Sequence, residues 1–196
     1  MPLGAFKAAL MGTAGVSAGA DVVLLSTTTA SNASAVSITS GIDSTYGEYI
    51  FRFYNINPAT DGAQFTFQGS IDAGSNYNVT LTSTVFDAHH DEADSSASLV
   101  NRPNNDQAQG TAFQQLVRDC GNGADESCAG VLHLFNPGST TYVTQFLSRF
   151  NSYNSGNQSV DMYVSGYFNN TNDIDAVQFK MHDGNFDGKI KMWGVK

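Results

Sequence analysis

The sequence predicts an all-β protein: a single antiparallel β-sandwich, jelly-roll-like, that follows a short N-terminal arm. Three observations predict this fold. Ten short stretches alternate apolar and polar residues or are rich in β-branched residues, as half-buried strands are. Clusters of Gly, Asn, Asp and Ser between them are typical of turns. Charged residues make up only 14% of the chain, against about 25% in ordinary domains, so polar neutral residues must cover much of the surface.

The ten predicted strands run in order along one domain, residues 21–196. They are residues 21–29, 34–39, 46–56, 64–68, 79–86, 130–136, 140–151, 159–169, 174–181 and 189–195. Alternation within these segments places large apolar side chains on one face of each strand, which we expect to be the buried face. The side chains expected in the core are Phe51, Phe53, Phe65, Phe67, Val131, Phe135, Phe179 and Trp193.

The middle of the chain shows weaker periodicity. Residues 87–110 are long and polar, and we expect an excursion between strands. The following segment TAFQQLVRDCG, residues 111–121, predicts the one short helix, because Thr111 can cap it and Phe113, Leu116 and Val117 share a helical face.

Residues 1–20 differ from the rest. Leu3, Phe6 and Leu10 recur at helical spacing, Met11 follows, and a Gly/Ala-rich spacer separates them from the first strand. This pattern favours an attachment arm that orders against a partner. The alternative is a frayed terminus.

The charge balance argues against two classes of partner. The chain has 18 acidic and 9 basic residues, a net charge of −9, and no run of Lys or Arg, so we expect no nucleic-acid binding, which depends on neutralising phosphates. No segment approaches the roughly 18 apolar residues that a membrane-spanning helix needs. We therefore expect no membrane partner.

Two motifs resemble metal sites. DGNFDG, residues 183–188, matches the start of an EF-hand calcium loop, but the twelfth position, which should hold a bidentate acid, is Gly194. Asp-Gly and Gly-Asn suit a tight turn, so we interpret the segment as a β-hairpin turn. DAHHDEAD, residues 87–94, is rich in ligand-type residues, but neighbours on an extended chain point to opposite sides. We interpret it as a solvated loop and expect no metal and no cofactor.

The two cysteines, Cys120 and Cys128, bracket the loop GNGADES. Their spacing matches neither a zinc knuckle nor a redox CxxC motif. The sequence therefore leaves two alternatives open, a disulfide between the two cysteines and a pair of free thiols.

Nothing in the sequence indicates catalysis. The one G-x-S-x-G match, GVSAG at residues 15–19, belongs to the Gly/Ala-rich spacer and not to the strand-to-helix elbow that a nucleophilic serine needs. The histidines have no spacing that suggests a triad. A catalytic pair of carboxylates that come together only in the folded chain would not be visible in the sequence. The small number of charged residues makes such a pair less expected. We expect a protein that is not an enzyme.

The second half of the chain resembles a known family. The blocks CGNGADESCAGVLHLFNPGSTTYVTQFLSRF, SGYFNNTNDIDAVQFKM and GNFDGKIKMWGVK resemble, in this order, blocks of virion structural proteins from marine tailed bacteriophages. STYGEYIFRFYNINPATDGAQFTFQ and IDAGSNY are similar to that family's first half, so the resemblance covers most of residues 40–196. It implies a β-sandwich located in the virion, as a capsid decoration, knob, fibre or tail component, without catalytic residues.

Two functions follow as expectations. The first is a structural protein that contacts other virion proteins through its arm and forms a homo-oligomer, a trimer in first place and a dimer in second, because exposed edge strands with few charges favour association. The expected interface residues are Tyr142, Phe146, Tyr163 and Phe168. The alternative is a carbohydrate-binding, lectin-like module of a tail fibre that recognises a host glycan, with Tyr77 and Tyr153 as candidate platforms.

Overall fold

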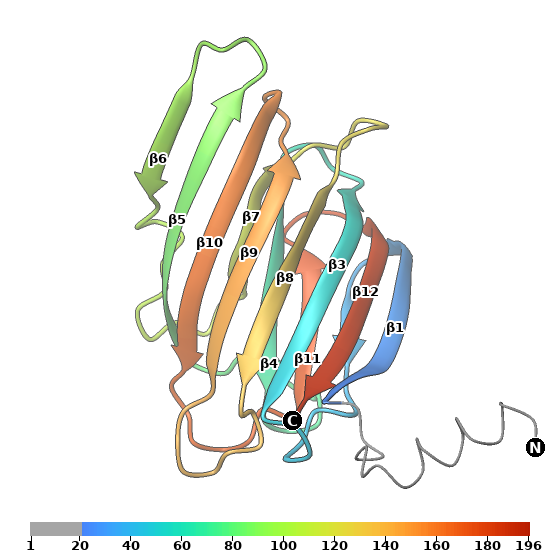
Figure 1. Ribbon diagram of the computed structural model, residues 1–196, viewed down its shortest axis with the longest axis vertical. Coiled ribbons are helices and arrows are strands. Elements are labelled where there is room, and N and C mark those ends of the chain that lie inside the picture. The colour runs from blue at the N-terminus through green and yellow to red at the C-terminus, as the bar shows by residue number, and fades with distance from the viewer. Residues whose placement is uncertain (1–20) are drawn as a thin grey trace, which may run out of the picture.

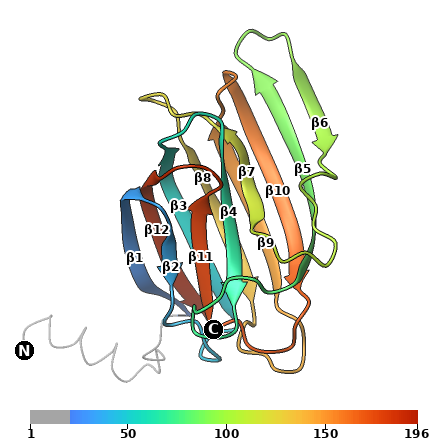
Figure 2. The same ribbon diagram turned by 180° about the vertical axis from the view of Figure 1, so that it is seen from behind.

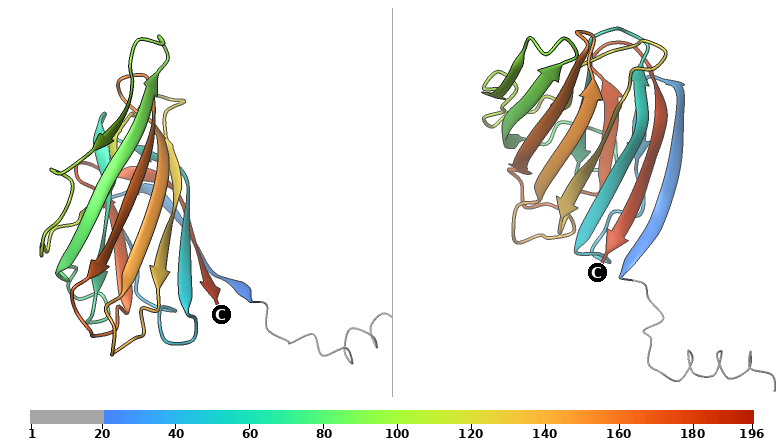
Figure 3. Two further views of the ribbon diagram at one scale, coloured as in Figure 1. Left: turned by 60° about the vertical axis from the view of Figure 1, so that its left-hand side comes forward. Right: turned by 45° about the horizontal axis from the view of Figure 1, so that its top comes forward.

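A computed structural model describes residues 21–196 of the chain, and these residues form two antiparallel β-sheets packed face to face. The predicted all-β sandwich is confirmed: no helix occurs within the described part. The expected attachment arm, with Leu3, Phe6, Leu10 and Met11, lies outside the described residues. Figure 1 shows the larger sheet in front, Figure 2 shows the smaller sheet from behind, and Figure 3 shows both layers from other sides.

Twelve strands make up the sandwich. They are β1 (Val22–Ala33), β2 (Val36–Ile38), β3 (Glu48–Pro58), β4 (Ala63–Ser70), β5 (Leu81–Asp91), β6 (Ala97–Asn101), β7 (Gln114–Cys120), β8 (Cys128–Phe135), β9 (Gln145–Tyr153), β10 (Gln158–Phe168), β11 (Ala176–Met181) and β12 (Phe186–Val195). The eight-stranded sheet has the order β1-β12-β3-β8-β9-β10-β5-β6, and the four-stranded sheet has the order β2-β11-β4-β7.

The core lies between the sheets and is rich in phenylalanine. Phe53 and Phe179 lie at its centre, with ring centroids 5.0 Å apart, and Phe65 contacts both. Tilted and edge-to-face pairs of this kind add to the gain from removing the rings from water. The predicted burial of five phenylalanines is confirmed: they are Phe51, Phe53, Phe65, Phe67 and Phe179.

Three residues expected in the core lie elsewhere. Val131, Phe135 and Trp193 are only partly buried and belong to the outer face of the eight-stranded sheet. Their strands bury the intervening positions instead, which are Leu132, Leu134 and Met192. Alternation divides a strand into two faces but does not say which face meets the second sheet. Both faces of β8 carry apolar side chains, and on β12 the large Trp193 ring lies on the face opposite Met192, so residue size alone indicates the wrong face.

The predicted β-hairpin around residues 183–188 is also wrong, because the two strands that flank the turn do not pair with each other. The chain does turn there, and Gly184 has a φ of 74°, a value that glycine tolerates readily. However, β11 belongs to the four-stranded sheet and β12 to the eight-stranded sheet. The segment therefore carries the chain from one layer to the other, because turn chemistry encodes the reversal and not the partner of each strand.

The predicted helix at residues 111–121 is a strand. β7 occupies most of it and pairs with β4 through two register shifts near Phe65. These irregularities leave four consecutive buried residues, from Gln114 to Val117, and such a run hides the two-residue period. The two buried glutamines are hydrogen-bonded: the Gln114 Nε2 donates to the Gln115 carbonyl at 2.9 Å, and the Gln115 Nε2 donates to the Val117 carbonyl at 3.2 Å.

The polar connection expected at residues 87–110 begins later in the chain than predicted. Residues 87–91, the first part of DAHHDEAD, continue β5 and pair with β10 on one side and β6 on the other. Only the residues after Asp91 form a turn before β6. The solvated-loop interpretation is therefore wrong for Asp87, His89 and their neighbours.

Candidate interaction face on the eight-stranded sheet

The outer face of the eight-stranded sheet, which points away from the four-stranded sheet, gathers most of the exposed apolar side chains. Seven large apolar residues are exposed in the described chain, and six of them lie on this face. They are Val22, Leu24, Tyr54, Phe86, Leu99 and Leu147. Tyr54, Phe86 and Leu147 alternate with core residues along their strands. Val22, Leu24 and Leu99 are placed there by their cross-strand partners, which are Val195, Trp193 and Ala88. A concentration of this kind marks an interaction surface in soluble proteins.

The aromatic patch occupies one half of this face. We define it as Phe86 on β5, Tyr163 on β10, Leu147 on β9, and Val131 and His133 on β8. These residues line a shallow hollow of about 440 Å³. The Phe86 and Tyr163 rings are cross-strand partners and stack with centroids 4.8 Å apart and an interplanar angle of 6°. The patch is therefore a flat, apolar platform that the sheet itself holds in place.

A charged pair borders the aromatic patch. The Arg149 guanidinium lies 4.9 Å from the centroid of the Tyr163 ring. It donates to both oxygens of Asp161, at 3.0 Å from Nε and 2.7 Å from Nη2. The hydrogen bond and charge of Asp161 raise the pKa of Arg149. The bidentate geometry gives the rim of the platform a defined orientation.

The basic patch occupies the other half of the face. We define it as Arg52 and Tyr54 on β3 with Lys189 and Lys191 on β12. A hollow of about 510 Å³ is lined by Tyr54, Lys189 and Lys191. The Lys191 ammonium lies 5.8 Å from the Tyr54 ring centroid, and the Arg52 guanidinium lies 5.5 Å from that of Trp193. Within residues 21–196, none of the three cations has an acidic group at ion-pair distance.

Strand pairing, and not sequence proximity, assembles both patches. Lys191 pairs with Arg52, Arg52 pairs with Val131, and Arg149 pairs with both Val131 and Tyr163. One row of residues thus crosses the sheet from the basic patch to the aromatic patch. The sequence shows isolated charges and aromatics on separate strands, and the only signal that could have found them is their outward position in each alternating segment.

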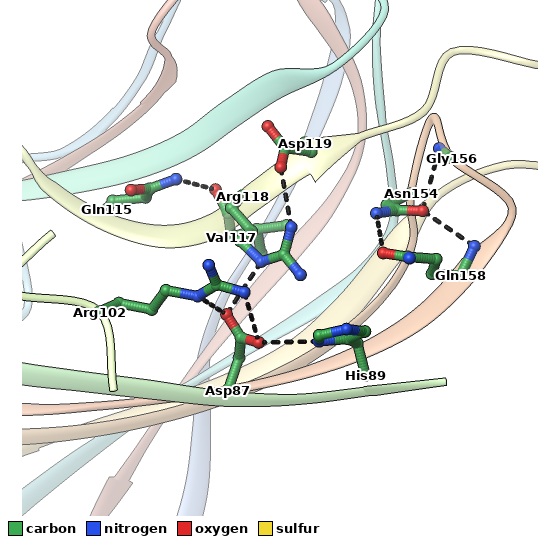
Figure 4. A network of polar contacts seen from close by, with 10 residues as sticks. All are labelled: Asp87, His89, Arg102, Gln115, Val117, Arg118, Asp119, Asn154, Gly156 and Gln158. Carbon is green, nitrogen blue, oxygen red and sulfur yellow. Dashed lines mark hydrogen bonds and ion pairs between the residues drawn. The ribbon is translucent and has the colours of Figure 1, made fainter. Parts of the chain in front are cut away.

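A buried ionic cluster lies at the β5 end of the sandwich (Figure 4). The Asp87 carboxylate is fully buried and accepts hydrogen bonds from Arg102 at 2.5 and 3.0 Å and from Arg118 at 2.9 Å, while the His89 Nδ1 lies 3.6 Å away. Burial raises the pKa of Asp87, but the hydrogen bonds and charges of the two arginines outweigh it, so the pKa lies below its ordinary value of 3.8. The cluster links three segments: Arg118 on β7 and Arg102 after β6 both bind Asp87 on β5. Because the carboxylate of Asp87 is closed off from solvent, we interpret the cluster as a structural link between these three segments.

The two tyrosines predicted as sugar platforms are both partly buried, but they lie in different surroundings. The Tyr77 hydroxyl oxygen is buried. Tyr153 lines a polar hollow of about 330 Å³ together with His90, Glu92 and Asn151. Of the two, Tyr153 is the one that borders a hollow with polar groups.

Two of the four predicted interface residues are buried and two lie on the surface. Phe146 and Phe168 are fully buried in the core, so the structure removes them from any contact with a partner. Tyr163 lies in the aromatic patch, and Tyr142 is 74% exposed in the loop between β8 and β9.

The turn at residues 183–188, which resembles the start of a calcium loop, does not bring its acidic side chains together. The Asp187 carboxylate accepts the Asn32 N–H at 2.7 Å, Asp183 contacts His182, and the Asn185 amide donates to Asn32. Across residues 21–196, no three His, Cys, Asp or Glu side chains are grouped so that they could hold a metal ion.

No protein-family model and no curated protein matches the chain in sequence. In the described residues, no helix is long and apolar enough to span a membrane.

Proposed function

We propose that this protein is a non-enzymatic structural protein of a bacteriophage virion, a capsid decoration, knob, fibre or tail component, that associates with copies of itself through the outer face of the eight-stranded sheet. The observation that carries the self-association is that six of the seven exposed large apolar residues lie on this one face. The sequence blocks that resemble virion structural proteins support the location in the particle.

The size of the face suits a second copy of the chain. Eight strands about 4.8 Å apart span roughly 34 Å, and seven residues along a strand span roughly 23 Å. The resulting footprint, on the order of 800 Å², equals one side of an interface of standard size. A trimer is the first expectation and a dimer the second, because copies of one chain close their contacts through symmetry.

Charge also favours a neighbouring copy as the occupant. The basic patch carries three cations without acidic partners, whereas the whole chain has a net charge of −9. An acidic surface of another subunit would therefore complement this half of the face.

A pair of matched variants tests the contact. Phe86→Ser removes a ring that is 41% exposed in the aromatic patch. Phe113→Ser removes a partly exposed ring beneath Lys180 of the four-stranded sheet. Light scattering at micromolar concentration should give an oligomeric mass for the unmodified chain and for Phe113→Ser, and a monomeric mass for Phe86→Ser. A strictly monomeric unmodified chain, or an oligomer that survives Phe86→Ser, would overturn the assignment of this face.

A second experiment tests the location in the virion. Removal of residues 1–20 should leave a folded sandwich, because the described core and the side chains packed against it come from Leu25 onward. We expect the truncated chain not to enter phage particles, as judged by mass spectrometry of purified virions. Incorporation at normal occupancy would mean that the segment is not an attachment arm.

Glycan binding is the second candidate function. It is favoured by the hollow around Tyr153, where an aromatic ring lies beside carboxylate, amide and imidazole groups. A glycan array should then show binding that Tyr153→Ala abolishes. If the chain bound no glycan, or if Tyr153→Ala still bound one, the assignment of this hollow as a glycan site would be contradicted.

A further inference from the structure

Two thiols lie close together at the junction of the two sheets. Cys120 ends β7 and Cys128 begins β8, and both are free and buried, with exposures of 0% and 1%. Buried cysteines commonly behave as small apolar residues. The position of Cys120 and Cys128 relative to their neighbours also permits a covalent bond between the two sulfur atoms.

Strand pairing fixes the separation of the two cysteines. Cys128 pairs with Ser152 of β9, and Cys120 forms a bridge with Asn154, two residues further along the same chain. Both lie beside the same edge of that chain, since the Tyr153 N–H donates to the Ser127 carbonyl and the Tyr153 carbonyl accepts from Gly121. A step of two residues along a strand is about 6 to 7 Å, which reaches the range of Cα separations found in disulfides.

The two side chains also point to the same place. Ser152 and Asn154 are both buried, so the cysteines opposite them face inward as well. The Cys120 sulfur lies 3.8 Å from the carbonyl oxygen of Ile56, and Ile56 is the β3 partner of Cys128. The Cys120 sulfur therefore lies beside the residue that pairs with Cys128, and the two cysteine side chains interact.

The loop between them is tightly held. The Gly123 N–H donates to the Glu126 carboxylate at 2.6 Å, and the Asn57 amide donates to the Glu126 carbonyl at 2.7 Å. These contacts order the middle of the loop, and the hydrogen bonds of Gly121 and Ser127 to Tyr153 hold its two ends on one residue. A cross-link would therefore need little rearrangement of the backbone.

We propose that Cys120 and Cys128 form an intramolecular disulfide that joins the four-stranded sheet to the eight-stranded sheet when the chain folds in the presence of an oxidised thiol compound. The oxidant in this reaction is glutathione disulfide. One cysteine thiolate attacks it and releases one glutathione thiol, and the second cysteine then attacks the mixed disulfide and releases the other. The two cysteines lose two electrons and two protons, and one glutathione disulfide becomes two glutathione thiols.

Burial determines when this reaction is fast. Burial, and next the neighbouring Cys120 thiol, raise the pKa of Cys128, and the thiolate is the attacking form. Oxidation should therefore be slow in the folded protein and fast during refolding, while the thiols are exposed.

The test is refolding of the full chain with glutathione disulfide and, in parallel, with a reductant. After denaturation, iodoacetamide should label both cysteines of the reduced sample and neither cysteine of the oxidised one. The oxidised chain should be lighter by two hydrogens and should stay monomeric on a non-reducing gel. Its Tm should rise by roughly 5 °C or more, because the cross-link restricts the unfolded chain.

The single variants Cys120→Ala and Cys128→Ala are the controls. In each, glutathione disulfide should leave the Tm without this rise. The proposal is overturned if the oxidised unmodified chain retains two labelled thiols, carries bound glutathione, forms covalent dimers, or melts at or below the temperature of the reduced chain.

Discussion

The two faces of the eight-stranded sheet carry similar aromatic side chains in different surroundings. On the inner face, Phe53 and Phe150 pack at a centroid distance of 5.0 Å beneath the four-stranded sheet. On the outer face, the stacked Phe86 and Tyr163 have neighbours within their own sheet, among them the Arg149–Asp161 pair, and no second sheet covers them. The comparison teaches that ring content alone does not identify a core. What distinguishes the core is whether a second layer covers the rings.

The outer rings are also interleaved with charge, and the inner rings are not. Arg52 lies over Trp193 and Arg149 lies over Tyr163. Long cationic side chains can cover an aromatic ring with their stems and keep their charge in water. This arrangement suits a face that is exposed in the free chain and covered in an assembly.

The largest expected effect is the loss of an inner ring. Phe179→Ala should lower the free energy of unfolding by about 3–5 kcal/mol, because the ring is fully buried among Phe51, Phe53 and Phe65 and its removal leaves a cavity. Chemical denaturation measures the change. A loss below about 1 kcal/mol would mean that the inner and outer rings are equivalent.

The next effect concerns the buried ionic cluster. Asp87→Asn should lower the free energy of unfolding by roughly 3 kcal/mol, because Arg102 loses its carboxylate partner and Arg118 keeps only the half-exposed Asp119. Urea denaturation of both chains at neutral pH measures the difference. An unchanged midpoint would show that solvent already screens the two arginines.

The same cluster predicts a pH dependence. The pKa of Asp87 is lower in the folded chain than its ordinary value of 3.8, so its stabilisation is complete above that value and is lost as the pH falls through the folded pKa. Between pH 5 and pH 2, the Tm of the unmodified chain should fall more than that of Asp87→Asn. Parallel curves for the two chains would contradict the assignment.

An outer ring should matter little to folding. Phe86→Ser should change the free energy of unfolding of the monomer by about 1 kcal/mol or less, since it loses one cross-strand stack on an exposed surface. Denaturation at concentrations below those of association measures this. A loss as large as that of Phe179→Ala would mean that the outer face belongs to the folding core.

The smallest expected effect is that of a chelator. EDTA should leave the Tm unchanged within error, because Gly194 supplies no carboxylate and Asp187 is engaged by Asn32. A fall of several degrees that calcium reverses would instead make Asp183, Asn185 and Asp187 ligands.

The sequence by itself determined the class of fold and most of the strands. Its two-residue periodicity is a local property, and so are the turn residues that separate the strands. For the same reason, it placed Phe51, Phe53, Phe65, Phe67 and Phe179 in the core: their strands carry bulky apolar residues on one face and mostly polar residues on the other.

Only the tertiary structure decided the rest. It assigned β11 and β12 to different sheets, turned residues 114–120 into a strand, and placed Val131, Phe135 and Trp193 on the outer face. It also brought Arg52 next to Lys191 and Cys120 next to Cys128. Each of these outcomes depends on which strand pairs with which and which face the second sheet covers, and pairing between distant segments leaves no period in the sequence from which it could be predicted.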